Sequence, residues 1–101
     1  MKKNLKTSEK VKFILSEILK ISINKTEDDI EMNKVPQWDS VAQLLIISSL
    51  EDKFNIQFSS SEISKLIDLK SIIKIIEKKV LFGKELVNYI KQFLNFFFKH
   101  K

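Results

Sequence analysis

The chain has 101 residues, with a net charge of +5, one Gly, one Pro and no Cys. This length suits one small domain. The scarcity of Gly and Pro argues against a loop-rich or disordered chain, and also against an all-β fold, which needs many turns. The absence of Cys excludes disulfides, thiolate metal sites and Cys nucleophiles.

The charge is unevenly distributed along the chain. Residues 1–20 carry net +4, residues 21–77 net −4 and residues 78–101 net +5, and every cation is Lys. Arg is the residue best suited to bidentate recognition of bases and phosphates, so a Lys-only surface gives little support to specific nucleic-acid binding. No stretch reaches the roughly 18 apolar residues that a membrane span needs. We therefore expect a cytoplasmic protein without a specific nucleic-acid partner.

The first predicted helix covers about residues 8–20, and Thr7 or Ser8 can cap its start. Its apolar residues fall on one helical face: Val11, Ile14, Leu15 and Ile18. Residues 21–39 lose this period and indicate a long loop with an acidic cluster at residues 27–29. Four apolar side chains are expected to pin the loop to the core: Ile21, Ile23, Ile30 and Met32.

The second predicted helix begins after Asp39, because Asp is a favoured N-cap residue. The run over residues 41–50 is apolar on more than one side, which predicts a central and well-buried helix. This helix is expected to end near Phe54, since Asn55 tolerates the left-handed conformation that is common after a helix.

Residues 54–58 alternate between apolar and polar side chains, as a short strand does. Nothing else in the chain offers a partner strand. We therefore predict an extended connection with three side chains buried in the core: Phe54, Ile56 and Phe58.

Two further helices are predicted from their capping residues. Ser59 and Glu62 fit a capping box at the start of a short helix over about residues 60–67. Asp68 can cap a fourth helix, from Leu69 to about Phe82. This fourth helix is expected to be buried through Ile72, Ile73, Ile76 and Val80, and to end where Gly83 follows it.

The last segment, residues 84–98, predicts a separate amphipathic helix. Its apolar face contains Leu86, Val87, Ile90, Phe93, Leu94 and Phe97. Three arrangements could cover this face: it folds back on the other helices, pairs with a second copy, or lies on an anionic membrane or partner. The lysines that favour surface binding are Lys84, Lys91, Lys99 and Lys101.

One constellation of residues carries a functional signal. Residues 37–41 read Gln-Trp-Asp-Ser-Val, an apolar helix with Leu44-Leu45 follows, and residues 50–56 read Leu-Glu-Asp-Lys-Phe-Asn-Ile. This arrangement resembles the acyl carrier protein family over about residues 8–82. The family has Asp-Ser-Leu or a close variant at the start of its second helix, and a Leu-Glu-x-x-Phe-Gly-Ile-like stretch about ten residues later.

The resemblance implies a fold and a modified residue. The fold is all-α, a small four-helix bundle of acyl carrier type with an additional C-terminal amphipathic helix. The implied domains are a carrier domain over residues 1–83 and a helical extension over residues 84–101. Ser40 would carry covalent 4′-phosphopantetheine, with Asp39 as the helix cap beside it. No catalytic residue and no metal ligand is implied.

The resemblance also implies a function without catalysis. The arm would hold an acyl or aminoacyl group as a thioester and present it to other enzymes, as in lipid or fatty acid biosynthesis. The implied partners are a phosphopantetheinyl transferase, a loading ligase or transferase, and a downstream biosynthetic enzyme.

Four positions depart from the family pattern, and two other functions compete with the carrier function. Val41 replaces the commoner Leu, Asn55 replaces the usual Gly, and Gln37-Trp38 replaces a Gly-x pair. We expect Trp38 to pack the loop against the helix start. The main alternative function is a non-catalytic basic module that binds a protein partner or an anionic membrane surface. A hydrolase that uses Ser40 is disfavoured, because no Gly-rich elbow surrounds this serine.

Overall fold

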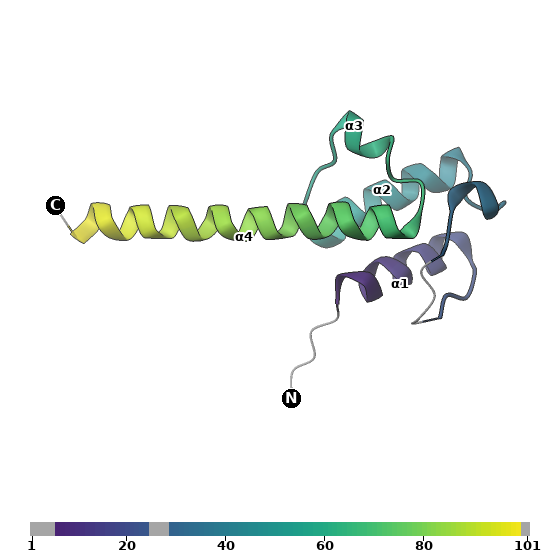
Figure 1. The fold of residues 1–101 in the computed structure, drawn as a ribbon, viewed down its shortest axis with the longest axis horizontal. Helices are drawn as coiled ribbons and strands as arrows, with labels where there is room; N and C mark the ends of the chain where they lie inside the picture. The colour runs from purple at the N-terminus through teal and green to yellow at the C-terminus, as the bar shows by residue number, and fades with distance from the viewer. Residues whose placement is uncertain (1–5, 25–28, 100–101) are drawn as a thin grey trace.

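The computed structural model of the protein describes residues 6–24 and 29–99, and it leaves the side chain of Lys84 undescribed. The expectations for residues 27–28 and for Lys101 lie outside this part of the chain. The elements in chain order are α1 (Thr7–Leu19), the 3-10 helix η1 (Met32–Lys34), α2 (Ser40–Phe54), α3 (Ser60–Ile63) and α4 (Leu69–Lys99) (Figure 1).

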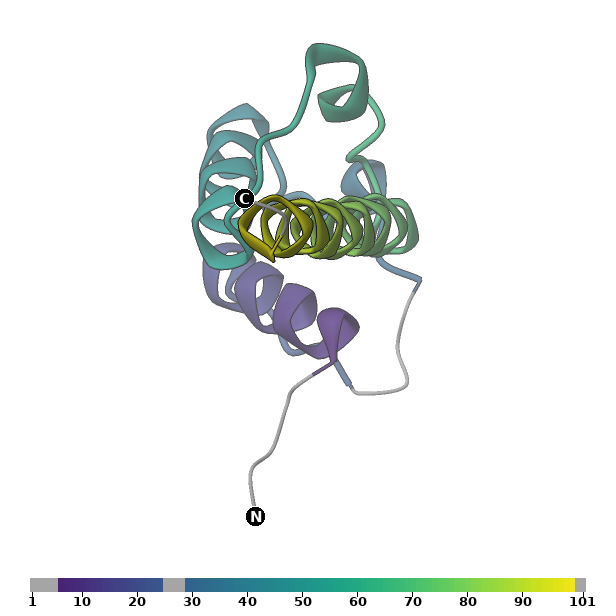
Figure 2. The ribbon, with the colours of Figure 1, turned by 90° about the vertical axis from the view of Figure 1, so that its left-hand side faces the viewer.

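The helices pack around α1, which contacts both α2 and α4. Figure 2, which looks along α4 from its C-terminal end, shows α3 above that helix, α2 to its left and α1 below it. The core is wholly apolar and is formed by Val11, Leu15, Leu19, Ile30, Trp38, Ala42, Ile46, Ile47, Leu50, Phe58, Leu66, Leu69, Ile72 and Ile76. The predicted all-α, four-helix architecture is therefore confirmed.

The long loop after α1 is pinned to the core as expected. Ile30 is buried, and Ile21, Ile23 and Met32 pack against the core from partly buried positions. Two backbone hydrogen bonds add to this attachment: Met32 N–H donates to the Ile67 carbonyl at 2.8 Å, and Leu69 N–H donates to the Ile30 carbonyl at 2.8 Å. These two bonds form an isolated antiparallel bridge between Glu31 and Asp68, which is too short to be a strand.

The capping of α1 differs from the prediction. The helix begins at Thr7, and the backbone N–H of Lys6 donates to the Glu9 carboxylate at 3.2 Å. The expected cap by Thr7 or Ser8 is therefore wrong. The prediction placed the helix start one residue too late, because Ser and Thr are stronger N-cap residues than Lys.

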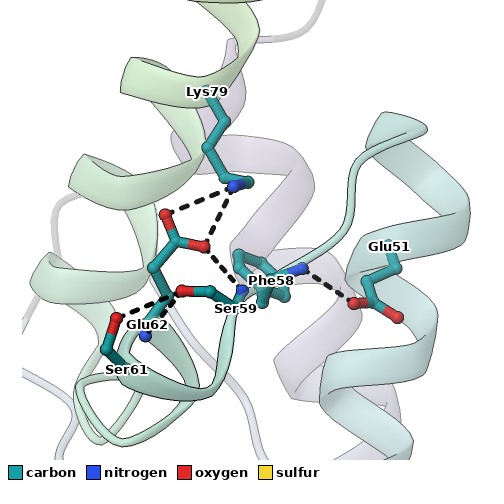
Figure 3. Close-up of polar contacts among 6 residues, drawn as sticks. All are labelled: Glu51, Phe58, Ser59, Ser61, Glu62 and Lys79. Atoms are coloured by element: carbon teal, nitrogen blue, oxygen red, sulfur yellow. Dashed lines mark hydrogen bonds and ion pairs between the residues drawn. The ribbon is translucent and has the colours of Figure 1, made fainter.

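The connection between α2 and α3, residues 56–59, has no regular secondary structure, and its apolar side chains pack inward as predicted. Phe58 is buried, and Phe54 and Ile56 pack partly buried against the core. Asn55 ends α2 in the left-handed conformation, with φ 55°. Figure 3 shows how the Phe58 N–H then donates to the Glu51 carboxylate, at 2.9 Å, which ties the connection back to α2.

The capping box of α3 is present and is joined to α4 by an ion pair (Figure 3). Ser59 N–H donates to Glu62 at 2.8 Å, Glu62 N–H donates to the Ser59 hydroxyl at 3.2 Å, and Lys79 Nζ lies 2.9 Å from Glu62 Oε1. The hydrogen bond from Ser59, helped by the Lys79 ammonium, holds the pKa of Glu62 below its usual value. These contacts fix α3 against α4.

The third helix is shorter than predicted and ends at Ile63 instead of residue 67. Lys65 N–H bonds to the Glu62 carbonyl and Leu66 N–H to the Ile63 carbonyl, which are tighter turns than an α-helix has. This tightening carries Leu66 inward, where it is fully buried. The α-helical part of α3 therefore ends where these tighter turns begin.

The separate C-terminal helix predicted after Gly83 does not exist, because α4 runs for 31 residues through this position. A single mid-helix Gly costs only about 1 kcal/mol relative to Ala, and Gly83 keeps a negative φ. At 1.5 Å per residue α4 spans about 46 Å, in a molecule with a longest extent of 60 Å. Its last part, residues 84–99, is called the C-terminal extension, and most of it projects beyond the bundle (Figure 1).

The proposed division into a carrier domain and an extension predicts unequal effects of two matched substitutions. Leu15 is fully buried in α1, whereas Leu86 in the extension is 47% exposed. Leu15→Ala should lower the free energy of unfolding by about 2–5 kcal/mol through lost burial and a cavity. Leu86→Ala should leave it within about 0.5 kcal/mol. Urea unfolding followed by circular dichroism measures both, and a large loss for Leu86→Ala would show that the extension folds onto the bundle.

Candidate functional site

Ser40 is the first residue of α2, and its side chain is exposed. The preceding residue, Asp39, is the N-cap that the sequence predicts. Its carboxylate accepts the Ala42 N–H at 2.9 Å, and its backbone carbonyl accepts the Gln43 N–H at 2.8 Å. Capping thus fixes the point at which the helix begins, and this places the Ser40 hydroxyl at the surface.

The helix dipole favours an anion at this position, where the Asp39 carboxylate already accepts one backbone N–H. The first turn of a helix exposes backbone N–H groups without helical partners, and the helix dipole adds a partial positive charge there. A phosphate attached to the first-turn serine would lie in this field, which contributes about 0.3–1 kcal/mol at an exposed site. An exposed hydroxyl at a capped helix start therefore suits a phosphodiester.

The loop before Ser40 is held by a buried tryptophan and a glutamine. Trp38 is only 3% exposed, and its Nε1–H donates to Gln43 Oε1 at 2.6 Å. The Gln43 amide in turn donates from Nε2 to the Leu66 carbonyl at 2.9 Å. Trp38 therefore packs the loop against α2, as expected, and Gln43 joins this loop to the turn that follows α3.

The role of Gln43 is one that the sequence analysis missed. The residue stands as a single amide within the apolar run of α2. A buried or partly buried polar side chain requires hydrogen-bond partners, so an isolated Gln in such a run is a signal for a structural bridge. Its two partners come from segments 5 and 23 residues away along the chain. Only the tertiary structure identifies the more distant of them.

The helix α2 is less buried than the sequence predicts. Ala42, Ile46, Ile47 and Leu50 are in the core, but Val41 is 67% exposed, Leu44 69% and Leu45 53%. The prediction of burial on several sides is therefore wrong for the side next to Ser40. The two acids of α2, Glu51 and Asp52, lie at its far end, so this exposed side is apolar and uncharged.

Within the part of the chain that the structure describes, no group of three or more His, Asp or Glu side chains could hold a metal ion. The single histidine, His100, lies outside the described residues. A surface cavity of about 450 Å³ lies near the loop and is lined by Glu31, Met32, Asn33, Trp38, Ile67 and Asp68.

The fold matches that of a known protein class. A holo acyl carrier protein from Geobacter metallireducens, solved by NMR in solution, superimposes with a TM-score of 0.68 and 23% sequence identity, over 78% of this chain and 91% of that one. No protein-family model matches the sequence, and no curated protein sequence matches it. The chain thus has the fold of an acyl carrier protein.

The bridge made by Gln43 predicts a measurable cost for its removal. Gln43→Ala leaves the buried Trp38 Nε1–H without its acceptor, which should lower the free energy of unfolding by about 1–3 kcal/mol. Because Trp38 is the only tryptophan, its fluorescence emission should also change. The exposed Gln57 gives a control, since Gln57→Ala should alter neither property. Unchanged stability and emission in Gln43→Ala would contradict the bridge.

Proposed function

We propose that this chain is a carrier protein that holds a 4′-phosphopantetheine arm on Ser40 and does no chemistry of its own. The observation that carries the proposal is an exposed serine at the capped start of α2, in a chain with the acyl carrier protein fold. The Asp39-Ser40-Val41 motif supports the same residue. The attached phosphodiester would be an anion, and the N-terminus of a helix favours anions.

The proposed arm would supply a reactive group that the chain lacks. There is no Cys in the sequence, so the terminal thiol of phosphopantetheine would be the only thiol available for thioester formation. We propose that an acyl or aminoacyl group is carried as this thioester. The protein would contribute an attachment point and a surface, while partner enzymes would form and cleave the thioester bond.

The exposed apolar side of α2 supports docking by these partner enzymes. Val41, Leu44 and Leu45 lie one to five residues after Ser40, on the same exposed helix surface. Contiguous exposed apolar side chains of this kind are typical of interaction sites. The proposed partners are a phosphopantetheinyl transferase, a loading ligase or transferase, and a downstream biosynthetic enzyme that would consume the cargo. The cytoplasmic location stays a prediction from the sequence.

The carrier function predicts one modification at one serine. Incubation with coenzyme A and a phosphopantetheinyl transferase should raise the intact mass by about 340 Da, the mass of one phosphodiester-linked arm. Ser40→Ala should take up nothing and keep its helical circular dichroism. The matched control is Ser48→Ala, which removes another exposed serine of α2 and should be modified as wild type. An unmodified wild type, tested with several active transferases, would falsify the carrier proposal.

Asp39 is predicted to serve both the helix and the modification. Asp39→Ala removes the bond to the Ala42 N–H and should lower the free energy of unfolding by about 1 kcal/mol. Asp39→Asn keeps an N-cap acceptor and should restore that stability. If the carboxylate also assists the transferase, the modification rate of Asp39→Asn stays low, as in Asp39→Ala. Equal rates in wild type and both variants would limit Asp39 to capping.

A further inference from the structure

The C-terminal extension has a broad apolar face that is open to solvent. Its apolar side chains are between 44% and 68% exposed: Leu86, Val87, Tyr89, Ile90, Phe93, Leu94, Phe96, Phe97 and Phe98. The rings of Phe93 and Phe97 stack with centroids 6.5 Å apart, and Phe98 meets Phe97 edge-on at 5.4 Å. Such a concentration of exposed aromatic side chains marks an interaction surface.

This apolar face is continuous with the side of α4 that packs on the bundle. Val80, Gly83 and Val87 line a surface cavity of about 470 Å³ together with Phe54 and Ile56 of the bundle. Toward its C-terminus α4 runs on past the other helices, as Figure 1 shows. The bundle and the exposed apolar face therefore lie on the same side of α4.

The width of the apolar face is greater than one partner helix covers. Successive helix residues are about 100° apart, so the consecutive Phe96, Phe97 and Phe98 alone cover an arc of about 200°. A two-stranded coiled coil buries only the narrow seam of its a and d positions, and the extension is little more than two heptads long. The interface of a lipid bilayer is a continuous apolar medium and can cover an arc of this width.

The charge of the extension favours an anionic surface. Its only acidic residue is Glu85, and the helix side opposite the apolar face carries Lys91 and Lys99 among neutral amides. A polar side with lysines and an apolar side rich in Phe and Leu is the composition of helices that lie in the membrane interface. Each lysine near an anionic membrane contributes roughly 1 kcal/mol, a fivefold change in affinity.

We propose that the C-terminal extension docks on an anionic phospholipid surface, with its Phe-rich end entering the interface first. Because the bundle lies on the same side of α4 as the apolar face, a flat membrane meets the helix obliquely and not along its whole length. The extension is about 24 Å long at 1.5 Å per residue. Among the described residues no helix is long and apolar enough to cross a membrane, so the docked helix stays in the interface.

This docking leaves the candidate modification site accessible. The start of α2 lies at the end of the molecule opposite the C-terminus (Figure 1), and the longest extent of the molecule is 60 Å. A protein held at the end of its extension therefore keeps the Ser40 side directed away from the lipid. The proposal does not depend on modification of Ser40, since it rests on residues 84–99 alone.

The first test measures binding of the full chain to vesicles by co-sedimentation. Wild type should bind vesicles rich in phosphatidylglycerol and bind pure phosphatidylcholine vesicles at least tenfold more weakly. Replacing two aromatic side chains together, Phe93→Gln with Phe97→Gln, should weaken binding at least tenfold. The matched control is Phe13→Gln in α1, because Phe13 is 63% exposed but lies on the bundle. Wild-type binding by the double variant, or no binding by wild type, would overturn the proposal.

Two further measurements test the charge and the orientation of the helix. Lys91→Gln together with Lys99→Gln should weaken binding to phosphatidylglycerol by roughly 25-fold. In Phe97→Trp the emission should shift to the blue on vesicles, whereas Gln92→Trp on the opposite side should shift less. Equal shifts at the two positions, or binding unaffected by loss of the lysines, would contradict docking through this face.

A second copy of the chain is the competing occupant, and the mass of the protein in solution distinguishes the two. Light scattering should give a monomer of 11.9 kDa for the unmodified wild type without lipid. A dimer that the Phe93→Gln and Phe97→Gln substitutions dissociate would show that the apolar face is a self-association interface, and the membrane proposal would fail.

Discussion

Burial of the apolar side of α1 against α2 and α4 is the interaction on which the rest of the structure depends. Val11, Leu15 and Leu19 are almost completely removed from water, and each contributes about 1.5–3 kcal/mol through its buried side chain. The contact fixes α2 in place, and with it the capped helix start at Asp39. A domain this small has few such side chains, so the position of the candidate site rests on a core of modest size.

The candidate site is held in place by the core and by the Gln43 hydrogen bonds, and its outer side is exposed. Below it, Ala42 and Ile46 bury the inner side of α2 in the core. Behind it, Gln43 bonds to Trp38 and to the Leu66 carbonyl and fixes the preceding loop. The outer side of α2 stays apolar, uncharged and exposed. This combination suits a fixed attachment point beside a surface that partner enzymes would cover.

The long α4 gives the molecule two parts with different physical character. Its first half is buried through Leu69, Ile72 and Ile76, whereas the C-terminal extension buries none of its large apolar side chains. A single backbone thus joins a packed bundle to an unpacked amphipathic helix. The two proposals of function depend on different parts: the carrier function on the start of α2, and the membrane docking on the extension.

The sequence by itself determined the elements whose signals are local. The apolar period of α1 and the capping box of Ser59 and Glu62 involve residues within about seven positions, so they could be predicted. So could the caps at Asp39 and Asp68, whose carboxylates accept the Ala42 N–H at 2.9 Å and the Ser71 N–H at 2.7 Å. The Ser40 motif is local as well. The sequence-based prediction was wrong at the end of α3, where tighter turns precede the buried Leu66, and at Gly83, through which α4 continues.

Only the tertiary structure decided which sides of the helices are covered. A run that is apolar on several sides does not show which side meets the core, so the exposure of Val41 and Leu44 beside Ser40 could not be predicted. The bridge from Gln43 to Leu66 spans 23 residues and leaves no periodic signal. The C-terminal extension is a second example. Its apolar face predicts burial, and only the tertiary structure shows that most of this face lies beyond the bundle.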